Sequence, residues 1–236
     1  MLKLPPTTNV PWKPDVITQS IDQVAKARPE ALVEYLRLLV LHLDAMYSDI
    51  ASTANKNAQD AWDDMRVSLA SAKIPAANFP DWVKIKDDGA GSVGIYGYAF
   101  ADGEYAFLTT QISHRYKEGT LVYPHIHFMT TTNVSPADNF GIGLEYAWMN
   151  VGDTLSATTL VTQVVSTGVN SSYKEQKVNI PPAGIDGTGK KISSMFLCRL
   201  YRYAASVDNY AGDVIITDFD LHYQTDGLGS TNVTSK

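Results

Sequence analysis

The spacing of apolar residues changes along the chain and divides it into two unlike halves. Between residues 16 and 72 apolar residues recur at helical spacing, whereas from Val93 onward runs rich in Val, Ile, Thr, Tyr and Phe alternate with polar positions. A period near 3.6 is typical of an amphipathic helix, and a period of 2 of a half-buried strand. The sequence therefore predicts an α+β protein in which a helical, coiled-coil-like region precedes an antiparallel β-sandwich or jelly roll.

The longest helix is predicted to begin at Pro29, because the first helical position needs no backbone N–H. Its apolar residues follow alternating spacings of four and three, which is the seam of a coiled coil. Further apolar residues widen this stripe, which favours a homotrimer over a dimer. Packing of the helix on its own chain is an alternative of equal weight. We assign the seam to oligomerisation, through Leu32, Leu36, Leu39, Leu43, Met46 and Ile50.

Proline and glycine mark the boundaries between segments. Four prolines in the first 15 residues predict an extended arm, and Pro75, Pro80, Gly89 and Gly91 end the helical pattern. Eight strand-like runs follow, and no helical pattern between them is long enough for a parallel crossover. The predicted segments are an anchoring arm (1–15), a helical oligomerisation region (16–72), a linker (73–92) and the β-sandwich (93–236).

Composition and charge exclude several functional classes. The net charge of −6, without a run of Lys and Arg, argues against a nucleic-acid partner. Neither a signal peptide nor a membrane segment is expected, because no apolar run reaches about 20 residues. The single cysteine, Cys198, cannot form an internal disulfide. It shares a strand face with Phe196 and Leu200, which indicates a buried hydrophobe rather than a nucleophile.

Several ionisable side chains fall opposite the apolar faces of predicted strands. In "YPHIHF" the two histidines lie opposite Ile126 and Phe128, and the strands "TDFDLHY" and "GLEYAWM" show the same separation. If the apolar faces point into the sandwich, the ionisable groups lie on the outside of the sheets. These groups are His125, His127, Glu145, Asp218, Asp220 and His222.

Two of these histidines raise the question of a metal site. Residues 119–127 match the opening of the cupin metal motif, but methionine and threonine stand where cupins have a glutamate. A metal would need His222 and Glu145 beside His125 and His127, a set of three nitrogens and one oxygen suited to Zn, Fe or Mn. Strand parity turns the histidines away from the apolar face. We therefore favour cross-strand polar pairs and predict no metal, no other cofactor and no catalytic residue.

Motifs in the C-terminal half follow one another as "YPHIHF", "GLEYAWMNVGD", "ISSMFLCRLYR" and "DNYAGDVIITDFDLHYQTDGLGS", with a closing lysine. Over residues 120–236 this series resembles a group of virion structural proteins of tailed bacteriophages. The chain departs from that group in having Tyr123 where many members have histidine, and Phe128 where many have tryptophan.

The resemblance implies a non-enzymatic β-domain exposed on a virion, attached to the particle or to its own copies by the N-terminal segment. On this interpretation the protein is assembled in the bacterial cytoplasm, forms a homotrimer and docks onto a head, neck or tail component. Two alternatives remain open: a receptor-binding or glycan-binding virion module that recognises a host surface glycan, and a cupin-like metalloenzyme.

Overall fold

The computed structural model describes residues 29–134, 136–169, 171–234 and 236. The chain separates into two compact units, residues 1–55 and 56–236. The predicted anchoring arm and the first part of the predicted helical region, residues 16–28, lie outside the described residues.

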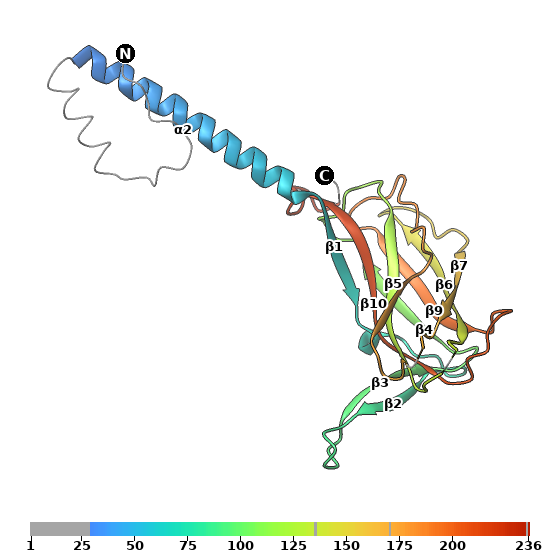
Figure 1. The fold of residues 1–236 in the computed structure, drawn as a ribbon. Helices are drawn as coiled ribbons and strands as arrows, with labels where there is room; N and C mark the ends of the chain where they lie inside the picture. Colours follow the sequence, from blue (N-terminus) through green and yellow to red (C-terminus); the bar gives the residue numbers. More distant parts are fainter. Residues whose placement is uncertain (1–28, 135, 170, 235) are drawn as a thin grey trace. The chain divides into compact units, whose positions relative to one another are not determined.

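Helix α2 runs over Pro29–Ala58 (Figure 1). After its first residue it contains neither proline nor glycine, which explains its uninterrupted length. Of the predicted seam residues, Leu36, Leu43, Met46 and Ile50 have exposed side chains and Leu39 is half-buried. The side chain of Leu32 lies outside the described residues. The helix is confirmed, whereas its role in oligomerisation stays a prediction.

The prediction of a helix up to residue 72 is wrong beyond Ala58. Residues Gln59–Val67 form strand β1, which pairs antiparallel with the last part of β10. The spacing of Trp62, Met65 and Leu69 suits a helix, but burial alternates along the strand with a period of two. Pairing with β10 satisfies the backbone of this segment, so a long-range contact overrides a weak local preference.

The predicted linker also contains regular structure. Its residues 81–86 form β2, which pairs antiparallel with β3, and the two strands make a hairpin at one end of the sandwich (Figure 1). The prolines and glycines of the linker lie outside β2 itself. These residues correctly predict the turns, but they give no signal for the short strand β2 between them.

Two antiparallel sheets form the sandwich in the described part of the chain. One sheet has six strands in the order β2-β3-β10-β5-β8, with β1 also paired to β10; the other has the order β4-β9-β6-β7. All eight strands expected after residue 93 are confirmed. They are β3 (Ile95–Phe100), β4 (Tyr105–Gln111), β5 (Val122–Thr130), β6 (Asn139–Met149), β7 (Thr159–Ser166), β8 (Gln176–Asn179), β9 (Met195–Tyr203) and β10 (Val214–Asp226), joined by β1 (Gln59–Val67) and β2 (Asp81–Lys86).

The core lies between the two sheets and consists of the apolar residues that strand alternation turns inward. Its fully buried rings come from both sheets, and they include Phe100, Phe128, Phe140, Phe196 and Phe219. Strand β10 is the long strand of the six-stranded sheet: one edge pairs with β5, while the other pairs first with β3 and then with β1. This arrangement brings β1, β10, β5 and β8 side by side beneath one outer face.

Candidate functional site

The outer face of the six-stranded sheet gathers polar side chains from four adjacent strands. The register places His125 of β5 opposite Asp220 of β10, and Asp64 of β1 opposite His222 of β10. Because strand side chains alternate, His127 shares the face of His125 two residues further on. Residues separated by more than 150 positions in the sequence thus meet on a single surface.

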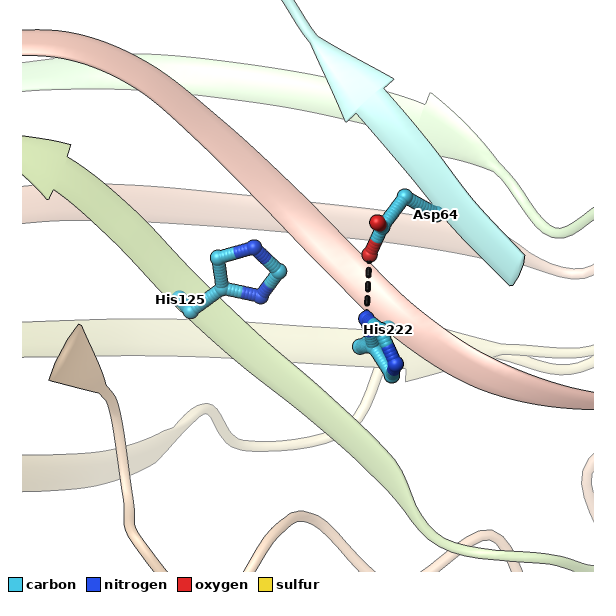
Figure 2. Close-up of side chains that lie close together, drawn as sticks. All are labelled: Asp64, His125 and His222. Atoms are coloured by element: carbon cyan, nitrogen blue, oxygen red, sulfur yellow. Dashed lines mark hydrogen bonds and ion pairs between the residues drawn. The ribbon is translucent and has the colours of Figure 1, made fainter. Parts of the chain in front are cut away.

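Close contacts join these side chains. The Nε2 atoms of His125 and His127 lie 3.5 and 3.4 Å from Oδ2 of Asp220. Nδ1 of His127 lies 2.6 Å from Oε1 of Glu175. On the β1 side, Nδ1 of His222 bonds to Oδ1 of Asp64, and His125 lies beside this pair (Figure 2).

The prediction that these groups lie on the outside of the sheets does not make all of them accessible to water. They do lie on the outer side of the sheet, but the side chains of His125 and Asp220 are only 2% and 7% exposed. Neighbouring rings cover His125: its ring lies 5.3 Å from that of His127 and 5.8 Å from that of His222, which in turn stacks on Trp62. Parity fixes the side of the sheet, whereas the neighbouring rings decide access to water.

Burial shifts the ionisation of both groups toward their neutral forms. Loss of hydration lowers the pKa of His125, and the bond to the backbone of Tyr123 only partly opposes this. Desolvation raises the pKa of Asp220, and the negative charge of Asp218 raises it further, against the attraction of His127. The site therefore holds ionisable groups in an environment that opposes their charges.

A cleft of about 280 Å³ lies beside this cluster. Trp62 is 47% exposed, and its indole meets the ring of Tyr123 edge to face at 5.6 Å. Polar side chains complete the lining. The lining residues are Trp62, Tyr123, Lys177, Asn179 and His222.

Of the four residues named for a metal from the sequence, His125 lies near both His127 and His222, but no group of ligand atoms among the described residues contains all three histidines. Glu145 lies in the other sheet on β6, where it pairs with Arg199. Two groups of ligand atoms lie within 4.8 Å of one another, and both take their carboxylate from an aspartate. They are Asp64, His125 and His222 (Figure 2), and His125, His127 and Asp220.

The sequence interpretation missed the contributions of β1 and β8. The predicted helical region contains Trp62, and the predicted site contains none of Asp64, Lys177 and Asn179. Alternation in "AWDDMRV", with Trp62 and Asp64 on one side and Met65 and Val67 on the other, is the signal that could have revealed β1.

The prediction that Cys198 is a buried hydrophobe rather than a nucleophile agrees with the structure. Cys198 is buried in the core, and its surroundings raise the pKa of the thiol to about 12. A thiol with that pKa stays protonated at neutral pH and is a poor nucleophile.

In the described part of the chain, no helix is long and apolar enough to span a membrane.

Neither a protein-family model nor a curated protein matches the chain. Among solved structures, a family 30 carbohydrate-binding module of a cellulosomal cellulase from Clostridium thermocellum is 16% identical, covering 67% of this chain and 96% of that one, with a TM-score of 0.33. TmCBM61 in complex with β-1,4-galactotriose is 14% identical, with coverage of 71% and 92% and a TM-score of 0.28. A chain of Desmodium yellow mottle tymovirus is 10% identical, with coverage of 73% and 90% and a TM-score of 0.22.

Proposed function

We propose that the β-sandwich is a non-catalytic glycan-binding domain and that the cleft on its six-stranded sheet holds the sugar. The half-exposed indole of Trp62, set against Tyr123 at the wall of a polar cleft, carries this proposal. A sugar ring has apolar C–H faces and a rim of hydroxyl groups. Aromatic rings cover the faces, and a few fixed polar groups bind the rim.

The polar lining suits a neutral or weakly acidic sugar. Lys177 donates hydrogen bonds and carries a positive charge, Asn179 both donates and accepts, and the ring of His222 is held by Asp64. Of the five lining residues none is a carboxylate. The cleft therefore lacks the pair of acids that glycoside hydrolysis uses, which favours binding without cleavage.

Replacement of the indole tests this proposal. We expect the full-length protein to bind members of an array of bacterial surface polysaccharides, and Trp62→Ala to weaken that binding at least about tenfold because the apolar platform is lost. Phe107→Ala is the matched control, since Phe107 is also exposed but lies on β4 of the other sheet. Absence of binding by the unaltered protein, or equal binding by the two variants, would refute the proposal.

We further propose that this domain belongs to a homo-oligomeric virion protein whose copies associate through α2. The exposed apolar side chains of that helix favour association, because a solvated helix gains little from such residues. Together with the bacteriophage resemblance of residues 120–236, they support a homotrimer that presents its β-domains on a head, neck or tail component. Labelling of intact phage particles with an antibody against the β-domain tests the location, and particles without label would contradict it.

A further inference from the structure

The buried part of the outer face holds a second set of contacts that glycan binding does not use. His125 and His127 of β5 both direct Nε2 toward Asp220 of β10, at 3.5 and 3.4 Å from Oδ2. The two imidazoles come from one strand face and the carboxylate from the neighbouring strand, so the backbone of the sheet fixes their separation.

The opposite nitrogen of each imidazole is held by an acceptor. Nδ1 of His125 lies 3.3 Å from the carbonyl oxygen of Tyr123, and Nδ1 of His127 lies 2.6 Å from the carboxylate of Glu175. Since a carbonyl and a carboxylate can only accept, Nδ1 is the donor in both contacts. In the neutral rings each Nε2 then presents a lone pair to Asp220, as in histidines that ligate metals.

Lone pairs that converge on a carboxylate repel it unless a proton or a metal ion lies between them. Oδ1 of Asp220 is buried, and none of the described residues donates a hydrogen bond to it. The nearest guanidinium, that of Arg66, lies 4.0 Å from it, is largely exposed and contacts Asp218 more closely. A buried carboxylate with so little compensation is costly, which indicates that its natural partner binds from solution.

We propose that His125, His127 and Asp220 bind one divalent transition-metal ion, with Zn²⁺ as the best fit. Two ligand atoms on a tetrahedral zinc ion stand about 3.4 Å apart when each bond is about 2.1 Å long, close to the two separations found here. Two imidazole nitrogens with one carboxylate suit Zn²⁺ or Fe²⁺, whereas Mg²⁺ and Ca²⁺ prefer sets made of oxygen alone. His127 is 32% exposed, which leaves a route for the ion and an open coordination position for water.

The second group, Asp64, His125 and His222, is the competing arrangement (Figure 2). In it Asp64 is half exposed and already bonded to His222. The orphaned oxygen belongs to Asp220, not to Asp64. The observations therefore favour the group of His125, His127 and Asp220. The variants described next distinguish the two groups.

The experiment is calorimetric titration of the chelator-stripped full-length protein with ZnSO₄ in the absence of any glycan, with bound zinc counted by mass spectrometry after dialysis. We expect one ion per chain, with affinity reduced at least about 100-fold in His127→Ala and Asp220→Asn, because each removes a ligand. His222→Ala and Asp64→Asn, the matched controls on the same face, should bind within about threefold of the unaltered protein. Titration with MgCl₂ or CaCl₂ should release no heat beyond the heat of dilution.

Two results would overturn the assignment: less than stoichiometric zinc in the unaltered protein, or loss of binding in His222→Ala with retention in His127→Ala, which would select the competing group. Thermal melting of each metal-free variant checks that it is folded. If a variant unfolds, the histidine ring nitrogens of the unaltered protein provide a second measurement, and zinc should shift the Nε2 resonances of His125 and His127. Trp62→Ala should still bind zinc, so failure of the glycan proposal and failure of the metal proposal are distinguishable.

Discussion

Helix α2 and the outer face of the six-stranded sheet depart from the usual distribution of side chains in opposite directions. The helix exposes large apolar residues, with Leu43 54% and Ile50 63% accessible, while the sheet buries His125 and Asp220. Exposed apolar patches and buried ionisable groups are the two informative exceptions to ordinary burial. The two proposals above assign a partner of matching chemistry to each departure: an apolar surface to the helix, and a cation to the sheet.

The largest expected effect concerns the helix. Changing Leu36, Leu39 and Leu43 together to Ser should reduce the mass measured by light scattering about threefold, from a trimer to a monomer, because the apolar seam is removed. Arg37→Ser is the control on the same helix, since Arg37 is exposed and pairs only with Glu34 among the contacts described. An unchanged mass for the triple variant would show that the stripe does not join copies.

Arg202 is a buried charge that has three hydrogen-bond acceptors, although its Nε has no partner among the described residues, and it should behave differently from Asp220. Arg202 is buried and donates to the carbonyl oxygens of Phe100, Tyr210 and Gly212, at 3.1, 2.6 and 2.6 Å. Arg202→Ala should lower the free energy of unfolding by about 3–5 kcal/mol, because it leaves buried carbonyl groups without their charged donor. Urea denaturation measures this, and a loss below about 1 kcal/mol would mean that burial of the charge matters little here.

Asp220→Asn should change the free energy of unfolding in the opposite direction from Arg202→Ala. In the presence of a chelator it should raise the free energy of unfolding by about 1–2 kcal/mol, since it removes a buried and poorly compensated charge while keeping the shape of the side chain. The same denaturation experiment measures the change. Destabilisation of similar size would show that the carboxylate is already well compensated by the protein.

The smallest effect is expected at Glu145, a carboxylate of the other sheet that has its cation. It accepts hydrogen bonds from Thr158 and Arg199, and these lower its pKa below 4.5, the bond from Thr158 contributing most. Glu145→Gln should cost less than about 1 kcal/mol at pH 7, because the pair is partly solvated. A lowered pKa stabilises the fold above about pH 4.5, and this contribution is lost as the pH falls through the folded-state pKa. The difference between variant and unaltered protein should therefore shrink in acid, and a difference that grows there would contradict this account.

Local patterns predicted the eight strands after residue 93 but failed at β1 and β2, which lie in segments whose own residues favour a helix or turns. The eight runs after residue 93 carry their own alternation and turn residues, so their assignment needed no tertiary information. Trp62, Met65 and Leu69 fitted a helical spacing over a short stretch, and only the edge of β10 selected the strand. The same limitation affected the site, because Asp64 and Trp62 reach His222 through that pairing.

The sequence by itself determined which side chains share a strand face, because alternation is a property of the extended backbone. It therefore placed His125 with His127, and Asp220 with His222, on faces turned away from the core. Strand order decided which faces became neighbours: β10 beside β5 brought Asp220 to the two imidazoles, and β6 in the other sheet kept Glu145 away. Burial of His125 also depended on neighbouring rings of β5 and β10, since access to water is set by the side chains that surround a group.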